Sequence, residues 1–309
     1  MIGQIKTLLK KAFPHPLKEA YYIGFLTKKE LSLPVVERYS KIKWLDVHDY
    51  EKEGWFADPF ILSVNENFVE LFVEEMIYST GRGIIAYLKV DLNTCKILEK
   101  KTMLDLDTHL SFPIYMEEAG KLYVYPENYQ SGSLKIYEYD SNCKKLVLPN
   151  TIIDAPLLDT QIVKIENVYY AFGVQFRGEG QNDTKRLYIY QSESLLGPYE
   201  QIQIIENPLC EERGAGLIYS DNGRLFRPAQ CCEGGYGKAV IIYELKKNGS
   251  AFEEIEETRI IPDRNALNGN VLHTYNCVDD VVVIDGWRYF YPRIAKLYAK
   301  VRGLNKNRM

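Results

Sequence analysis

The chain has 309 residues, a formal net charge of −4, 46% apolar residues and 24 tyrosines. This length allows one large domain or two ordinary ones, and the charge gives no sign of nucleic-acid binding. The six cysteines form no C-x-x-C pair and the four histidines lie far apart, which argues against a zinc site. We therefore predict a globular protein with no metal, no cofactor and no nucleic-acid partner.

The two ends of the chain differ from its middle. Residues 1–13 place apolar side chains at helical spacing with lysines on the other side, and residues 293–309 contain six basic residues and no acid. Both segments are predicted to be short helices. They are either solvated helices that pack on the body, or a basic surface that contacts anionic lipid.

The expected location follows from the same N-terminal segment. Residues 1–13 are amphipathic and lack the continuous apolar stretch of a signal peptide. We therefore expect a cytoplasmic protein with mostly reduced thiols. If the basic ends contact lipid, the protein is peripheral at the inner face of the membrane.

Five segments repeat one pattern: an apolar strand, a short polar turn and a second apolar strand. The turns read VNEN, EEAGK, IEN, SDNG and VDD, which are typical of hairpins. The segments are residues 58–75, 112–128, 158–175, 214–230 and 272–288. Each of the first four is followed by another strand pair, which gives four strands at a period of roughly fifty residues, the signature of a β-propeller blade.

The fifth repeat lacks its two outer strands. Residues 21–27 and 41–47 read as strands, and they can complete the last blade and leave no open sheet edge. We predict an all-β fold, a single five-bladed β-propeller domain of residues 1–309, with its blades over about 50–290. A β-sandwich is the alternative, and the regular period argues against it.

Polar residues recur at equivalent positions of the repeats. In a propeller the first strands begin, and the second strands end, at one mouth of the central channel, so these residues should converge there and form a polar pocket. At the strand starts they are Asp58, His109, Ser111, Asp159, Arg213 and His273. At the strand ends they are Glu74, Glu75, Glu127, Asn128, Gln175, Arg227, Gln230 and Arg288.

Each of these residues also has a structural interpretation. An Asp before Pro, as at Asp58, often marks a turn. Glu127 reads equally as a solvated loop acid. Glu74 and Glu75 are adjacent in a strand, so at most one of them faces the mouth. Arg227 is either the partner of an ion pair or an anion clamp, and His273 reads as a buried histidine of the core.

Several carboxylates at one mouth suit glycosyl chemistry. One acid protonates the leaving oxygen while another carboxylate activates water or stabilises the sugar cation. Repulsion between neighbouring carboxylates raises one pKa and keeps that acid protonated. The sequence does not fix the separation of the carboxylates, so inversion and retention both stay open.

The motifs WFADPF, HLSFPI, PEN, LLDT and NGRLFRPAQ occur in this order at blade spacing. With the Glu pair after the first motif, they resemble the propeller domain at the N-terminus of plant glucosamine inositolphosphorylceramide transferases and of bacterial proteins of surface-polysaccharide clusters. The resemblance covers about residues 50–290. In the plant proteins this domain accompanies a separate transferase domain, so the transferase activity does not follow from the resemblance alone.

More distantly, the chain is similar to the furanosidase-type propellers of the arabinanase and levansucrase clan. That resemblance implies that Asp58 is the base or nucleophile and that Asp159 orients and tunes the other catalytic residues. The clan's acid is a Glu in a later blade, where this chain reads EERGAG, so Glu212 and Glu127 are the candidates for the acid. The residues expected to bind substrate are Glu74, Glu75, His109, Gln175, Glu212, Arg213, Arg227, Gln230, His273 and Arg288.

These observations predict a carbohydrate-active enzyme that acts on a glycosyl bond in the assembly of cell-surface polysaccharide or glycolipid, with transfer favoured because activated sugars are cytosolic. A glycoside hydrolase of the furanosidase type is the first alternative. The second is a propeller that binds sugar without catalysis and presents an acceptor to a partner enzyme. In all three cases the expected partner is a sugar-containing substrate.

Overall fold

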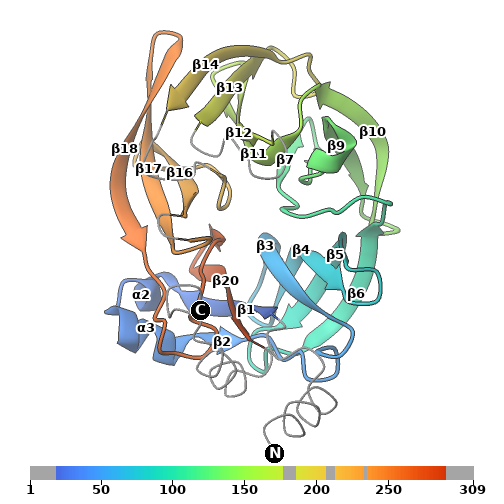
Figure 1. Ribbon diagram of the computed structural model, residues 1–309, viewed down its shortest axis with the longest axis vertical. Helices are drawn as coiled ribbons and strands as arrows, with labels where there is room; N and C mark the ends of the chain where they lie inside the picture. The colour runs from blue at the N-terminus through green and yellow to red at the C-terminus, as the bar shows by residue number, and fades with distance from the viewer. Residues whose placement is uncertain (1–18, 177–185, 207–212, 233–234, 290–309) are drawn as a thin grey trace, which may run out of the picture.

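The computed structural model describes residues 19–176, 186–206, 213–232 and 235–289. Five four-stranded antiparallel sheets are arranged as blades around a central axis (Figure 1). The prediction of an all-β, five-bladed propeller is therefore confirmed, and the β-sandwich is excluded. The two predicted terminal helices, residues 1–13 and 293–309, lie outside the described residues.

The blades are numbered in chain order, and each is given from the channel outward. Blade 1 comprises β3 (Gly54–Val64), β4 (Phe68–Ile77), β5 (Arg82–Asp91) and β6 (Ile97–Leu104). Blade 2 comprises β7 (Tyr115–Glu118), β8 (Lys121–Val124), β9 (Leu134–Asp140) and β10 (Lys145–Ile153). Blade 3 comprises β11 (Leu157–Ile165), β12 (Val168–Gln175), β13 (Arg186–Ser192) and β14 (Glu200–Glu206). Blade 4 comprises β15 (Tyr219–Asp221), β16 (Arg224–Cys231), β17 (Ala239–Asn248) and β18 (Ala251–Ile260). Blade 5 comprises β19 (Tyr275–Val278), β20 (Val281–Tyr289), β1 (Glu19–Thr27) and β2 (Lys43–Trp44).

The five predicted hairpin turns join the first two strands of every blade. Their chemistry explains why the chain reverses there. In blade 1 the Asn65 side chain accepts the N–H groups of Asn67 and Phe68, which closes an Asx turn. In blade 4 Asn222 and Gly223 both have positive φ, at 49° and 75°, and these are the residue types that a type I′ turn requires.

The N-terminal strands complete blade 5. All nine residues of β1 pair with β20, from Glu19 opposite Tyr289 to Thr27 opposite Val281. The connection between β1 and β2 holds two short helices, α2 (Lys28–Leu31) and α3 (Val35–Lys41), on the outside of the blade (Figure 1). Thr27 and Glu30 form a capping box at the start of α2. Joining strands from both ends of the chain in one sheet closes the ring.

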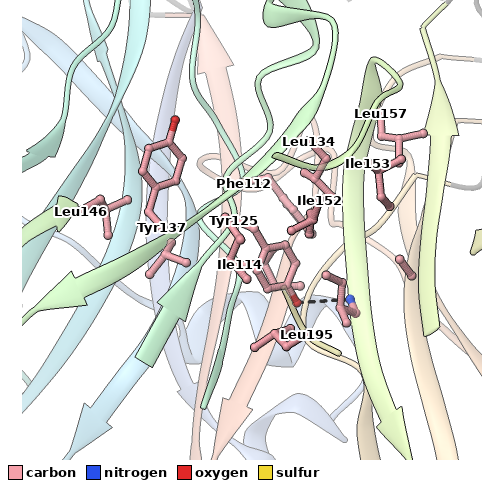
Figure 2. Packing of buried hydrophobic residues seen from close by; sticks show 14 of the residues in the cluster. Phe112, Ile114, Tyr125, Leu134, Tyr137, Leu146, Ile152, Ile153, Leu157 and Leu195 are labelled. Atoms are coloured by element: carbon pink, nitrogen blue, oxygen red, sulfur yellow. Dashed lines mark hydrogen bonds between the residues drawn. The ribbon is translucent and has the colours of Figure 1, made fainter. Parts of the chain in front are cut away.

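The apolar core lies between neighbouring blades rather than at one centre. The largest buried cluster extends from Phe60 in blade 1 through Phe112 and Tyr125 to Ile162 in blade 3. Figure 2 shows Tyr125 among apolar side chains of this cluster, and its hydroxyl accepts a 3.2 Å hydrogen bond from the Ile162 N–H. The inner strands β3 and β11 are buried over most of their length, so a charged residue within them stands out.

Across the part of the chain that the structure describes, no helix has the length and apolar character needed to cross a bilayer.

Candidate functional site

A pocket of about 410 Å³ lies where the first strands of the blades begin, and all five blades contribute to it. Its lining is rich in carboxyl and aromatic groups. The lining residues are Tyr21, Trp55, Asp58, Glu74, Met76, Gly81, His109, Ser111, Glu127, Tyr129, Gln130, Asp159, Arg213, Tyr236 and His273.

The backbone takes a left-handed conformation at the start of three blades. Asp58, Phe112 and Asp159 have φ values of 48°, 47° and 40°. The pairing of β3 with β4 slips between Ala57 and Phe60, and that of β11 with β12 slips between Leu158 and Gln161. A bulge of this kind turns a side chain out of the strand alternation, and non-glycine residues adopt this conformation only where the surroundings hold it.

Carboxylates from neighbouring blades hold these three residues. The Asp58 N–H donates to Asp285 at 3.2 Å, the Phe112 N–H to Asp58 at 3.0 Å and the Asp159 N–H to Glu127 at 3.0 Å. In each case a carboxylate of one blade accepts from the left-handed residue of the next blade. The buried acids at the mouth therefore fix the blades relative to one another.

Asp58 is buried, with 5% of its surface exposed. Its Oδ1 accepts from the Thr274 hydroxyl at 2.8 Å and lies 3.7 Å from Nε2 of His273. Burial raises the pKa of Asp58 to about 7. The positive charge of His273 acts to lower this pKa, and the charge of Glu74 acts to raise it further. This carboxyl can gain or lose a proton near neutral pH.

Glu127 and Asp159 form a carboxyl pair with Arg213. Oδ2 of Asp159 accepts from Nε of Arg213 at 2.7 Å and from the Gln230 amide at 2.8 Å, whereas Glu127 lies 3.4 Å from Nη2 of Arg213. Burial and the Asp159 charge hold the pKa of Glu127 well above its usual range. Burial acts to raise the pKa of Asp159 too, but the Arg213 guanidinium and hydrogen bonds outweigh it and lower that pKa. The surroundings therefore favour the protonated form of Glu127 and the ionised form of Asp159.

Glu74 faces the pocket beside His109. Nδ1 of His109 accepts the Gly83 N–H at 3.0 Å, which leaves the ring proton on Nε2, 3.3 Å from Oε1 of Glu74. A Cβ at Gly83 would lie 2.4 Å from the Leu110 carbonyl oxygen, so only glycine permits this close approach.

His273 and Asp285 form a second charged pair below Asp58. Asp285 is completely buried, and its Oδ1 accepts from Nδ1 of His273 at 2.6 Å and from the Thr274 N–H at 3.0 Å. Burial acts to lower the pKa of His273, but the Asp285 charge and hydrogen bond raise it to about 9. Among the described residues, Asp58, His273 and Asp285 are the group whose spacing would suit a metal ion. A protonated imidazole that is bound to a carboxylate acts as a counter-ion instead.

The structure brings most of the predicted site residues together. Asp58, Glu74, His109, Ser111, Glu127, Asp159, Arg213 and His273 all line the pocket. Gln230 lies behind the pocket, where its amide donates to Asp159 and to the Gly214 carbonyl oxygen. Glu212 lies outside the described residues.

Besides Gln230, five predicted residues do not line the pocket: Glu75, Asn128, Gln175, Arg227 and Arg288. Glu75 points the other way, toward the Tyr50 hydroxyl at 2.5 Å and the Lys100 ammonium group. Gln175 donates to the Tyr190 hydroxyl, and Arg288 lies near Glu51 and Tyr22. The completely buried Arg227 pairs with Glu254 and Gln161, so it is an ion-pair partner within blade 4 and not an anion clamp at the mouth.

Sequence reasoning missed the aromatic part of the lining and Asp285. The aromatic residues are Tyr21, Trp55, Tyr129 and Tyr236. Asp285 carries the same signal that singled out Asp58, because it is an acid within the apolar strand VVVIDGW. The aromatic residues had no comparable signal in a chain with 24 tyrosines.

Comparison with known proteins identifies relatives of the blade region. Two proteins named glucosamine inositolphosphorylceramide transferase 1 are each 28% identical to the chain. The one from Oryza sativa subsp. japonica matches over 238 residues, 71% of this chain and 31% of its own length. The one from Arabidopsis thaliana matches over 206 residues, 62% of this chain and 26% of its own length. The chain thus spans less than a third of these relatives.

Two solved structures with a similar fold are both distant from this chain in sequence. The catalytic domain of a Coprinopsis cinerea α-L-arabinofuranosidase superposes with a TM-score of 0.54 at 10% identity, over 77% of this chain and 92% of that one. A putative exo-β-1,3-galactanase from Bifidobacterium bifidum gives a TM-score of 0.51 at 14% identity, over 66% of this chain and 72% of that one. At such identities these likenesses show the propeller fold alone.

The family match covers most of the blades. Residues 33–284 match the family described as glucosamine inositolphosphorylceramide transferase 1, N-terminal. These residues begin in the connection between β1 and β2 and end within β20, and they include every lining residue of the pocket except Tyr21. By this match over most of its length, the chain belongs to the family of the N-terminal region of glucosamine inositolphosphorylceramide transferase 1.

Proposed function

We propose that the pocket binds a sugar and that the protein transfers a glycosyl group in the assembly of a cell-surface polysaccharide or glycolipid. The names of the relatives support a sugar-containing substrate, since those proteins are called glucosamine inositolphosphorylceramide transferases. The match covers less than a third of them, so the proposal rests on the pocket itself.

One observation supports it above the others: a single pocket brings together buried carboxyl groups whose surroundings favour opposite protonation states. Glu127 is the proton-carrying acid, Asp159 is ionised by Arg213, and Asp58 titrates near neutrality. Breaking a glycosyl bond needs an acid for the leaving oxygen and a carboxylate for the sugar cation.

The roles follow from these protonation states. Glu127 gives its proton to the leaving oxygen as the bond from that oxygen to the anomeric carbon breaks. Asp58 faces the positive charge that develops on the sugar, and the acceptor hydroxyl then bonds to the anomeric carbon and passes its proton to a carboxylate. Arg213 and Gln230 do not contact the reacting bond in this scheme; they hold Asp159 ionised, which keeps the Glu127 proton in place.

Hydrolysis is the alternative outcome at the same site. If water replaces the acceptor hydroxyl, the same acid and carboxylate release a free sugar. The solved structures of similar fold include glycosidases, but at 10% identity that likeness does not bear on the reaction.

Sugar binding without catalysis is a second candidate function, and the hydrogen bonds between blades favour it. Asp58 and Glu127 each accept a backbone N–H of the next blade, besides any chemical role. Their burial is therefore explained by the fold as well as by catalysis.

Product analysis separates the three candidates. The protein is incubated with mixtures of glycosides, nucleotide sugars and short glycan acceptors, and the products are identified by mass spectrometry. A lengthened glycan supports transfer, a free sugar supports hydrolysis, and neither product supports binding alone. The Glu127→Gln variant is the control, because it keeps an acceptor for the Asp159 N–H and removes the proton that transfer and hydrolysis both require.

We also propose that the protein acts at the cytoplasmic face of a membrane. The six basic residues and absence of acids in residues 293–309 support contact with anionic lipid, each such residue contributing about 1 kcal/mol near the surface. Co-sedimentation with vesicles of phosphatidylserine and phosphatidylcholine should exceed that with phosphatidylcholine alone and should fall with added salt. Equal co-sedimentation in all conditions would remove this proposal.

A further inference from the structure

We infer, on the basis of the proposed function, that the pocket takes an uncharged sugar ring between an aromatic wall and a carboxyl wall, and that it rejects anionic sugars. The aromatic wall consists of Trp55, Tyr21 and Tyr236, with the ring of His273 between the two tyrosines. The carboxyl wall consists of Asp58, Glu74, Glu127 and Asp159. Both walls line the same pocket.

The aromatic wall is a continuous row of rings. The ring centroids of Trp55 and Tyr21 are 4.7 Å apart, those of Tyr21 and His273 5.1 Å, and those of His273 and Tyr236 5.3 Å. The row runs from blade 1 across blade 5 to the segment between β16 and β17 in blade 4. Aromatic faces in contact with a pocket suit the C–H face of a sugar ring, which is apolar, and their polar ends suit its hydroxyls.

The hydroxyls of this wall are available to a ligand. Neither the Tyr21 nor the Tyr236 hydroxyl has a hydrogen-bond partner within the described part of the chain, whereas Tyr22 and Tyr50, just outside the pocket, both do. Tyr236 is 40% exposed and stands between Gly235 and Gly237, whose φ values of 140° and 59° set its direction. A large aromatic side chain that is left open to solvent at a pocket rim is a contact surface for a ligand.

The carboxyl wall comes mostly from other blades than the aromatic wall. Its four members come from blades 1, 2 and 3, while the aromatic wall takes Tyr21 from blade 5, Tyr236 from blade 4 and Trp55 from blade 1 (Figure 1). A ring seated between the walls therefore presents one face to aromatic carbon and its hydroxyl edge to carboxyl oxygens, which accept hydrogen bonds from sugar hydroxyls.

The cations of the pocket are already neutralised. Arg213 is bound to Asp159 and Glu127, and its guanidinium carbon lies 5.6 Å from the centroid of the Tyr236 ring. His273 is bound to Asp285, and His109 donates toward Glu74. Within the described residues, no lining cation faces the pocket without a carboxylate partner.

An anionic ligand would therefore find no free cation to pair with, because each lining cation is already bound to a carboxylate. A carboxylate, phosphate or diphosphate group in this pocket faces Asp58, Glu74 and Asp159 in a partly buried setting, where repulsion is stronger than in water. Such an unfavourable interaction acts as a filter against charged sugars, since specificity arises from what a site repels as well as from what it attracts. A transferase with this pocket would bind a neutral glycoside or acceptor here, and not the diphosphate of a nucleotide sugar.

Calorimetric titration with matched sugar pairs tests the inference without requiring turnover. The probes are methyl glucoside against methyl glucuronide, methyl galactoside against methyl galacturonide, and N-acetylglucosamine against its 1-phosphate and its uridine diphosphate ester. The neutral member of at least one pair should bind at least about tenfold more tightly than its anionic partners. Anionic members that bind as well as neutral ones, with or without Mg²⁺ or Mn²⁺, would overturn the inference, as would a lack of binding by every probe at millimolar concentration.

Two variants with matched controls locate the effect in the two walls. Tyr236→Ala should lower the affinity for the neutral sugar about tenfold, whereas Tyr123→Ala, on β8 outside the pocket, should not change it. Glu74→Gln should narrow the difference in affinity between neutral and anionic sugars, whereas Glu75→Gln should leave that difference unchanged. Equal effects of a variant and its control would contradict the assignment of that wall.

The failure of this inference can be told apart from failure of the proposed function. Tight binding of a neutral sugar without any glycosyl product supports the two walls and contradicts the proposed reaction. Transfer or hydrolysis of an anionic sugar supports the proposed reaction and contradicts the exclusion of anionic sugars.

Discussion

The backbone N–H of Asp159 donates a 3.0 Å hydrogen bond to Oε2 of Glu127, so an acid at the end of the second strand of blade 2 binds the residue that begins blade 3. Asp58 holds Phe112 in the same way across blades 1 and 2. In the proposed reaction these acids combine a chemical and a structural role, and replacing either by alanine would remove both at once. Amide replacements separate the roles, because an amide oxygen still accepts the backbone N–H while the charge is lost.

Asp58→Asn should remove activity and preserve the fold. The Asn oxygen can accept the Phe112 N–H, and its amide nitrogen can donate to the Thr274 hydroxyl, which rotates to accept. If Asp58 is the base or nucleophile, turnover should fall by about two to four orders of magnitude. Turnover is measured with the substrate that product analysis identifies, and folding by thermal denaturation.

Glu75→Gln is the matched control for Asp58→Asn. Glu75 lies opposite Phe56 on the neighbouring strand, but its side chain contacts Tyr50 and Lys100 outside the pocket. Turnover of the control should stay close to that of the unmodified protein. An Asp58→Asn protein that melts normally and keeps full turnover would limit Asp58 to binding or structure.

Arg213→Met should destabilise the protein strongly. Arg213 is the cation shared by Asp159 and Glu127, whose side chains are almost completely buried. Its loss leaves the buried Asp159 carboxylate without its counter-ion, which costs about 3–5 kcal/mol of the free energy of unfolding. Denaturation by urea, followed by tryptophan fluorescence, measures the change.

An exposed ion pair provides the comparison for Arg213. Arg186 lies 2.8 Å from Glu206, with side-chain exposures of 40% and 67%. Arg186→Met should cost less than about 1 kcal/mol, because water screens the pair. If both arginine variants lose the same free energy, the carboxyl pair does not depend on Arg213 for its stability.

The repeat pattern made the blades predictable from the sequence. Hairpin turns such as SDNG depend on local backbone preferences, and alternating apolar strands depend on burial, so both leave a signal within a few residues. The position of Asp58 was predictable for the same reason, because a carboxylate in an apolar strand is costly unless it has a partner.

The partners of these residues were not predictable. Glu74 and Glu75 are neighbours in sequence, and the register of β4 against β3, which includes a bulge next to Asp58, decides which of them faces the pocket. Arg227 pairs with Glu254 and Gln161 across 27 and 66 residues of sequence. Such contacts join strands and blades that only the folded ring brings together, and a single sequence carries no record of them.

Stability should decrease as the pH rises from 6.5 to about 9. Burial acts to lower the pKa of His273 in the folded protein. The charge and hydrogen bond of Asp285, with the charges of Asp58 and Asp159, outweigh burial and raise this pKa from 6.5 to about 9. The folded state then binds the proton more tightly than the unfolded state, so the stabilisation is complete below pH 6.5 and is lost as pH passes through the folded pKa. The largest change that this shift allows is about 3 kcal/mol.

His273→Asn should flatten this part of the pH profile. An Asn amide can donate to Asp285 from near the position of Nδ1 but cannot carry the charge. Melting temperatures are compared between pH 6.5 and 9, with His48→Asn as the control because His48 is exposed on the surface. A His273→Asn protein with the same pH profile as the control would show that His273 does not cause the decrease.

Ile23→Ala should weaken the closure of the ring. Ile23 is completely buried at the middle of β1, opposite Asp285 of β20, and β1 is the strand that joins the N-terminal segment to blade 5. Truncating it leaves a cavity in the cluster that also contains Phe56 and Val73 of blade 1, at a cost of about 2–5 kcal/mol in the free energy of unfolding. Val36→Ala on α3 is the control, since Val36 is 74% exposed and its loss should cost no more than about 0.5 kcal/mol. The two variants are compared by urea denaturation, and similar midpoints would mean that the ring does not depend on β1 for its stability.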